Sequence, residues 1–428
     1  MASHFLDRIS RGRGVATLAA ALLIGALGQV IALRSAVAPL AWTVPVGRAP
    51  SALALDPRTA RVFVADSDAA SVTMLDAHSG AVLRTIPVGA DPSALAVDVR
   101  TNRVFVVNAT FAGTRGSVSV LNASTGDLLR TVSVGAGPQA VAADERSGHV
   151  VVANSGADSV CLLDARSGRV LRTVTVGTSP SAVAVDARTE HAFVVSAFYP
   201  PRPGRSGTVS VLDTRTGALL RTVAVGQWPG AVTVDSRHGH VIVTNAGSRS
   251  VSALDAQSGA LLWTAPVGRD PTSAAVDEAS GHVFVPSGVD GTVSVLSIRT
   301  GALLWTVPVG IPTGAEAAGL GLSAVAMDER RGRALVLRGD QASVGLLDGR
   351  SGVVLRTVAV GVHPLAVAID AGADRAFVLD FGGVAPPSTA WWDRAVAGLG
   401  HWLPWLAQRT PARAGVPASV SVLVLGRL

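Results

Sequence analysis

Residues 180–226 begin with Pro-Ser-Ala-Val-Ala-Val-Asp-Ala-Arg-Thr-Glu-His-Ala-Phe-Val-Val-Ser and end with Leu-Leu-Arg-Thr-Val-Ala-Val-Gly. Four short runs in this stretch, at 181–185, 191–195, 208–212 and 219–225, are rich in β-branched residues. Asp, Gly and Pro separate the runs, which is the pattern of short strands joined by turns. Four strands in roughly 40–50 residues correspond to one blade of a β-propeller.

The same unit recurs along the chain, and its final Val-Gly pair marks each copy. The pair stands at intervals of 42 to 51 residues, at Val46-Gly47, Val88-Gly89, Val134-Gly135, Val176-Gly177, Val225-Gly226, Val267-Gly268, Val309-Gly310 and Val360-Gly361. Such a period predicts a ring of similar blades, and the absence of long helical patterns argues against helical solenoids.

The first and last units are incomplete in complementary ways. After Gly361 the chain supplies three strand patterns and no fourth, whereas residues 41–47, Ala-Trp-Thr-Val-Pro-Val-Gly, match the fourth-strand pattern of residues 304–310. A strand from the N-terminal side that completes the last blade would close the ring and remove two exposed edges. We therefore predict an all-β propeller of eight four-stranded blades; seven would require one irregular unit.

The repeats resemble the YVTN-type, or YncE-like, β-propeller family. The resemblance covers residues 41–428 and is carried by Pro-Ser-Ala-Val-Ala-Val-Asp (180–186), Thr-Asn-Arg-Val-Phe-Val-Val-Asn (101–108) and Ser-Val-Ser-Val-Leu-Asn-Ala-Ser-Thr-Gly (117–126). The chain departs from that family in its blade count and in having a single Tyr. The resemblance implies an exported binding or scaffolding propeller and transfers no catalytic residue to this chain.

The first 38 residues differ from the repeats. Three arginines precede an apolar run at 15–33, which at roughly 1.5 Å per helical residue is long enough to cross a bilayer core. The excess of Arg before the run predicts that the rest of the chain is exported. Residues 1–38 are therefore a signal anchor, or a signal peptide cleaved after Ala38, and residues 39–428 form the propeller.

Charge and composition limit the classes of partner and cofactor that we expect for this chain. All basic residues are Arg, the net charge is +6, and it falls to +3 without residues 1–38, so the propeller has no strongly basic surface and we expect no nucleic-acid partner. The single Cys161 excludes an intramolecular disulfide and a cysteine-based metal cluster. His149, His191, His240 and His282 share a repeat position with Arg residues, so we interpret them as structural. We predict no metal site and no cofactor.

Loop lengths distinguish the two faces of the ring. The connections from first to second and from third to fourth strand keep constant lengths, and we call their side the constant face. Every insertion lies on the other side, the variable face, as expected of a binding surface on a rigid scaffold. The candidate binding residues on that face are Tyr199, Arg202, Arg205, Trp228, Arg269, Asp270, Glu316 and His363.

The last blade carries an insertion at about 381–418 with four of the eight Trp residues: Trp391, Trp392, Trp402 and Trp405. Apolar residues at helical spacing predict a short helix that is kinked or ends before Pro404. It is either a lid across the variable face or, over residues 388–408, an interfacial helix in contact with the membrane. The four Trp residues complete the set of candidate binding residues.

Two classes of function fit these features. The first is an exported, envelope-located propeller that binds a protein, peptide or glycan through the variable face. The second is a propeller enzyme, either a lactonase-like hydrolase using Glu316, His363 and Arg269 or a quinone-cofactor protein. The quinone-cofactor hypothesis rests on Trp42, Trp263 and Trp305, which are similar to the Trp of the docking repeats in eight-bladed quinone enzymes. Five other units have Arg at this position. No catalytic signature is present, which favours the binding protein.

Overall fold

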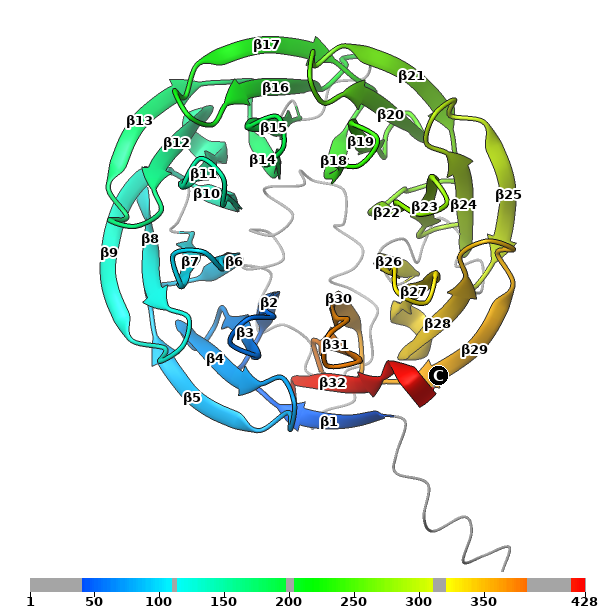
Figure 1. The fold of residues 1–428 in the computed structure, drawn as a ribbon, viewed down its shortest axis with the longest axis horizontal. Coiled ribbons are helices and arrows are strands. Elements are labelled where there is room, and N and C mark those ends of the chain that lie inside the picture. Colours follow the sequence, from blue (N-terminus) through cyan, green and yellow to red (C-terminus); the bar gives the residue numbers. More distant parts are fainter. Residues whose placement is uncertain (1–40, 110–113, 198–203, 311–320, 383–416, 428) are drawn as a thin grey trace, which may run out of the picture. The chain divides into compact units, whose positions relative to one another are not determined.

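The structure is a computed structural model, and it describes residues 41–109, 114–197, 204–310, 321–382 and 417–427. Residues 41–428 form one compact unit, in which eight four-stranded antiparallel sheets are arranged around a central axis (Figure 1). The predicted eight-bladed propeller is therefore confirmed. Blade 1 contains β2 to β5, and the numbering of blades follows the chain.

The four strands of each blade follow one another from the axis outward, in the same order in every blade. The strands nearest the axis are β2 (Pro50–Asp56), β6 (Pro92–Asp98), β10 (Pro138–Asp144), β14 (Pro180–Asp186), β18 (Pro229–Asp235), β22 (Ala275–Asp277), β26 (Leu322–Asp328) and β30 (Pro364–Asp370). The second strands are β3 (Arg61–Asp66), β7 (Arg103–Asn108), β11 (His149–Asn154), β15 (His191–Ser196), β19 (His240–Asn245), β23 (His282–Ser287), β27 (Arg333–Arg338) and β31 (Arg375–Asp380).

The third strands are β4 (Ser71–Asp76), β8 (Arg115–Asn122), β12 (Ser159–Asp164), β16 (Thr208–Asp213), β20 (Ser250–Asp255), β24 (Thr292–Ser297), β28 (Ser343–Asp348) and β32 (Ser419–Val424). The outer strands are β5 (Val82–Pro87), β9 (Leu128–Ala136), β13 (Val170–Thr175), β17 (Leu219–Ala224), β21 (Leu261–Pro266), β25 (Leu303–Pro308), β29 (Val354–Ala359) and β1 (Ala41–Pro45). Short 3-10 turns are η1 (Ser155–Ala157), η3 (Gly339–Gln341) and η5 (Leu425–Arg427).

The ring is closed by β1, as the sequence predicts. β1 pairs antiparallel with β32, with Ala41 opposite Leu423 and Pro45 opposite Ser419, so blade 8 takes its outer strand from the N-terminal side of the propeller (Figure 1). Val46 N continues the ladder to the carbonyl of Ala418. Both sequence ends of the repeat array therefore meet in one sheet.

The apolar core lies between blades. Eight buried clusters each join two neighbouring blades, one for every junction of the ring. Fully buried aromatic side chains from the middle of second strands anchor five blades: Phe63, Phe105, Phe193, Phe284 and Phe377. Burial of one such side chain stabilises the fold by about 1.5–3 kcal/mol, so the repeated Phe position holds each blade against its neighbour.

Polar turns at the ends of the strands explain the constant loop lengths. At the end of β2 the Asp56 carboxylate accepts hydrogen bonds from the backbone N–H groups of Arg58 and Thr59. The Asp76 carboxylate does the same for His78 and Ser79 after β4. These local Asx turns specify tight connections after β2 and β4.

Outer strands dock onto the next blade through either Trp or Arg. The indole Nε1 of Trp263 donates to the carbonyl of Ile298 at 3.0 Å, and the guanidinium of Arg172 donates to the carbonyl of Thr216 at 3.0 Å. Both acceptors lie in the turn between the third and outer strands of the following blade. Trp and Arg occupy the same repeat position, and these two examples show that either can donate a hydrogen bond at this place.

Blade 6 is irregular beside the axis. β22 has only three residues, and before it Pro271 makes one isolated bridge to Ser287. The facing strand β23 contains Pro286, which has no N–H to donate to the ladder, so regular pairing ends there. No helix in the described part of the chain is long and apolar enough to span a membrane; residues 15–33 lie outside it.

Candidate functional site

The loops that lead into the inner strands form a repeated structure on the variable face. In each blade, one residue directly precedes the innermost strand segment, which usually begins with Pro. We call these eight equivalent residues the inner-loop ring: Ala49, Asp91, Gly137, Ser179, Trp228, Asp270, Gly321 and His363. In seven blades the carbonyl of this residue accepts a hydrogen bond from the backbone of the loop after the second strand, for example from Ala246 N to Trp228 O at 3.0 Å. The non-glycine members have positive φ. Three sequence-predicted candidates, Trp228, Asp270 and His363, therefore occupy one structural position.

The side chains of Trp228, Asp270 and His363 each lie against the loop after the second strand of their own blade. A Cβ at Gly247 would come within 2.4 Å of the Trp228 indole, so glycine at 247 makes room for that ring. The Asp270 carboxylate lies similarly over Gly288, and burial raises the pKa of Asp270. The Nδ1 atom of His363 is 3.3 Å from the carbonyl oxygen of Gly382. Trp228 and Asp270 belong to neighbouring blades, whereas His363 belongs to blade 8.

Arg269 is held in an ion pair. Its Nε atom is 2.7 Å from Oδ1 of Asp290, and its backbone N–H donates to Oδ2 of the same carboxylate. Although burial acts to raise it, these hydrogen bonds hold the pKa of Asp290 below its usual value. Arg205 is exposed in the blade 4 loop. The other candidates lie outside the described residues: Tyr199, Arg202, Glu316, Trp391, Trp392, Trp402 and Trp405.

Three of the four histidines that share a position in the second strands contact the next blade, whereas Nδ1 of His240 is buried without a hydrogen-bond partner among the described residues. His149, His191 and His282 each place Nδ1 2.8–3.0 Å from a backbone carbonyl oxygen in the next blade. Arg375 occupies the same position and donates to the carbonyl of Ala77. Within the described ranges, no group of three or more His, Cys, Asp or Glu could hold a metal ion. Cys161 is buried and unbonded to another cysteine.

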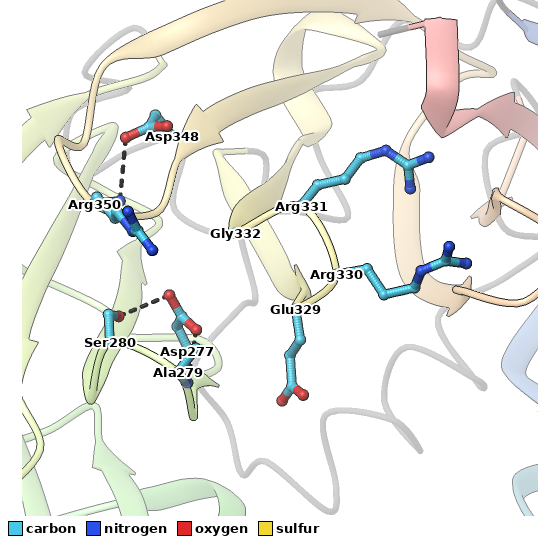
Figure 2. A pocket seen from close by; sticks show the side chains of 9 residues that line it. All are labelled: Asp277, Ala279, Ser280, Glu329, Arg330, Arg331, Gly332, Asp348 and Arg350. Carbon is cyan, nitrogen blue, oxygen red and sulfur yellow. Dashed lines mark hydrogen bonds between the residues drawn. The ribbon is translucent and has the colours of Figure 1, made fainter.

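A pocket lies on the constant face, for which the sequence suggested no binding residues. It has a volume of about 300 Å³ and is formed by turns of blades 6 and 7 (Figure 2). Its lining is Asp277, Ala279, Ser280, Glu329, Arg330, Arg331, Gly332, Asp348 and Arg350. The turns that form the pocket have the same length as those of the other blades, so loop lengths give no sign of it; blade 6 differs at this place in having Ala279 where six blades have Arg.

The charges of the pocket are unevenly distributed. Figure 2 shows Arg330 and Arg331 directed away from Asp277 and Ser280. Arg330 donates to the carbonyl of Ala371 in blade 8, and Arg331 pairs with Asp374 of blade 8 and with Asp328 of its own blade. Asp277 accepts a hydrogen bond from Ser280 Oγ at 2.7 Å. Burial is the main cause that raises the pKa of Glu329, and the neighbouring carboxylates of Glu278 and Asp277 act in the same direction.

A comparison of sequences decides the family. One family profile, described as outer membrane protein assembly factor BamB, matches residues 6–197 and 205–376, which is most of the chain. The chain belongs to the PQQ_2 family. For this PQQ_2 member, a search of curated proteins gives no match.

Two solved structures similar to this PQQ_2 member share its fold. Hydrazine synthase of Kuenenia stuttgartiensis is 16% identical, with a TM-score of 0.53 over 79% of this chain and 94% of that chain. Dihydro-heme d1 dehydrogenase NirN in complex with DHE is 16% identical, with a TM-score of 0.58 over 73% of this chain and 66% of that chain. Identity this low is evidence of common architecture alone.

Proposed function

We propose that this protein is an exported, non-enzymatic scaffold of the cell envelope that binds a protein, peptide or glycan through its variable face. The observation that carries the proposal is membership of a family described as outer membrane protein assembly factor BamB. Residues 1–38 supply the export signal or anchor, and residues 15–33, with residues 388–408 as a further candidate, contact the membrane. Within the family we infer that the repeats are of the YVTN type.

The inner-loop ring supports the choice of face. It combines Trp228, Asp270, His363 and Asp91 on backbone fixed by hydrogen bonds within each blade, so these side chains are presented with little ordering cost. An aromatic, an imidazole and two carboxylates offer apolar and polar contacts to a macromolecular partner. The Trp position that suggested a quinone enzyme lies in outer strands, where Trp263 contacts the next blade.

The choice of face is tested by photo-crosslinking in intact cells. A photoreactive amino acid replaces Trp228 or His363 on the variable face, and exposed Arg166 or Gln257 in constant-face turns serves as the matched control. We expect crosslinked partners from positions 228 and 363 and none from 166 and 257. Adducts confined to 166 and 257 would contradict the proposed face, and a lactone-hydrolysing activity lost in His363→Ala would contradict the non-enzymatic assignment.

A further inference from the structure

Arginines in the first turns of the blades brace most junctions on the constant face. Six blades carry Arg two residues after the Asp that ends the inner strand: Arg58, Arg100, Arg146, Arg188, Arg237 and Arg330. Each guanidinium reaches the equivalent turn of the following blade. For example, Arg188 Nε donates to Ser236 O at 3.0 Å, and Arg237 donates to Glu278 O at 3.3 Å. The space between the first turns of two neighbouring blades therefore accommodates a guanidinium group.

The other four arginines use different acceptor atoms, but each also contacts the turn of the following blade. Arg58 donates to Asn102 Oδ1 at 2.9 Å, and Arg146 Nε lies 3.2 Å from Glu190 Oε1. Arg100 and Arg330 donate to the carbonyls of Arg146 and Ala371. Backbone carbonyl and side-chain oxygens of the next turn therefore both serve as guanidinium acceptors in this ring.

Blade 6 has Ala279 at this position, and the pocket of about 300 Å³ occupies the corresponding space. The turn of blade 7 that would face an arginine here begins with Glu329. Blade 8 also lacks the arginine, because it has Gly372, but blade 1 has Pro57 where blade 7 has Glu329. Only the junction of blades 6 and 7 combines a missing arginine with a carboxylate on the facing turn.

We propose that this pocket binds a guanidinium group from another molecule, namely the arginine side chain of a partner peptide. The incoming group takes the place that the protein's own arginine holds at six other junctions, with Glu329 as its counter-ion. Asp277 adds negative charge at the opposite wall, where it lies beside Ser280 (Figure 2). Arg350 also borders the pocket and opposes the binding of a cation, which limits affinity.

The proposal concerns the constant face and is independent of the partner surface proposed above. Its probe is the peptide acetyl-Gly-Arg-Gly-amide, with the same peptides containing Lys or citrulline as controls. Binding to the full chain is measured by ligand-observed NMR. We expect the Arg peptide to bind at least tenfold more tightly than the citrulline peptide, because citrulline has the same shape without charge, and more tightly than the Lys peptide, which lacks the planar fork.

Three variants locate the binding. Ala279→Arg places the chain's own guanidinium in the pocket, so it should abolish peptide binding and raise the melting temperature. Glu329→Gln should weaken binding about tenfold, whereas Arg350→Gln should strengthen it by removing a like charge. Equal binding by wild type and Ala279→Arg, equal affinity for the Arg and citrulline peptides, or no binding to wild type would each overturn the proposal. The melting temperature distinguishes a filled pocket from a misfolded variant.

Discussion

Asp66 and Asp380 occupy the last position of the second strand in two neighbouring blades, where Asn108, Asn154 and Asn245 stand in others. Both carboxyl groups are fully buried. Oδ2 of Asp66 accepts from Thr73 Oγ1 at 2.6 Å, whereas Oδ1 of each has no partner among the described residues. Burial raises the pKa of Asp66 to about 6 and that of Asp380 to about 7.

These two groups make stability fall as pH rises. In the unfolded chain they ionise near pH 4, but in the folded chain they retain protons to about pH 6 and 7. Between these values the folded state binds more protons, so the free energy of unfolding decreases with increasing pH. We expect Asp66→Asn with Asp380→Asn to stabilise the protein at pH 8 by on the order of 3–6 kcal/mol and to have little effect at pH 4.

Denaturant unfolding at both pH values measures this difference. The reciprocal variant Asn108→Asp places a third carboxyl group at the equivalent position and should destabilise the protein at pH 8 far more than at pH 4. A double variant whose advantage over wild type is the same at pH 4 and pH 8 would show that these carboxyl groups do not titrate in this range.

At the scale of the element, outer strands dock on glycines of the next blade. A Cβ at Gly301 would come within 2.6 Å of the Trp263 ring, and Gly301 has φ +72°. A Cβ at Gly352 would meet Trp305 in the same way. Glycine at this turn therefore allows both the positive φ and the close approach of the indole. The sequence shows these residues as a Thr-Gly or Ser-Gly turn but not the partner that requires them.

Gly301→Ala separates the two effects when it is compared with Gly148→Ala. Gly148 has φ +73°, and only the tip of Arg100 at 3.9 Å would contact an added Cβ. Both variants force Ala into a left-handed conformation at a cost of about 1–2 kcal/mol, but Gly301→Ala must also displace Trp263. We expect it to lower the free energy of unfolding by about 1–3 kcal/mol more than the control. Equal losses would mean that the indole moves aside freely.

At the scale of the whole molecule, the ring depends on β1. Trp42, Val44 and Val46 pack into the cluster that joins blades 8 and 1, and β1 covers the edge of β32. Because every other junction is made within consecutive sequence, this one alone joins the two ends of the repeat array.

Removal of β1 should therefore destabilise the propeller strongly. A chain beginning at Ser51 lacks the strand, whereas one beginning at Pro39 retains it. We expect the shorter chain to lose on the order of 5 kcal/mol, a large share of a total stability of about 5–15 kcal/mol. Thermal unfolding compares the two, with a chain beginning at Ala41 as the control that should match Pro39. Identical melting of all three would refute closure by β1.

The sequence by itself determined the blade count and closure, because strand period, turn residues and the orphan pattern at 41–47 are local signals that recur. It also identified Trp228, Asp270 and His363 as residues that break the repeat. Their shared position depends on φ and on hydrogen bonds to a separate loop, so it became visible only in the structure.

Tertiary structure alone decided which side chains meet across a junction. Ala279 is an unremarkable turn residue in the sequence, and Glu329 lies 50 positions later. The turns of blades 6 and 7 together form the pocket, and blade 6 has no arginine at the position from which six other blades reach the next turn. Likewise, the raised pKa values of Asp66 and Asp380 follow from burial. Local sequence patterns predict strands and turns, but the space and dielectric between blades arise only when the ring assembles.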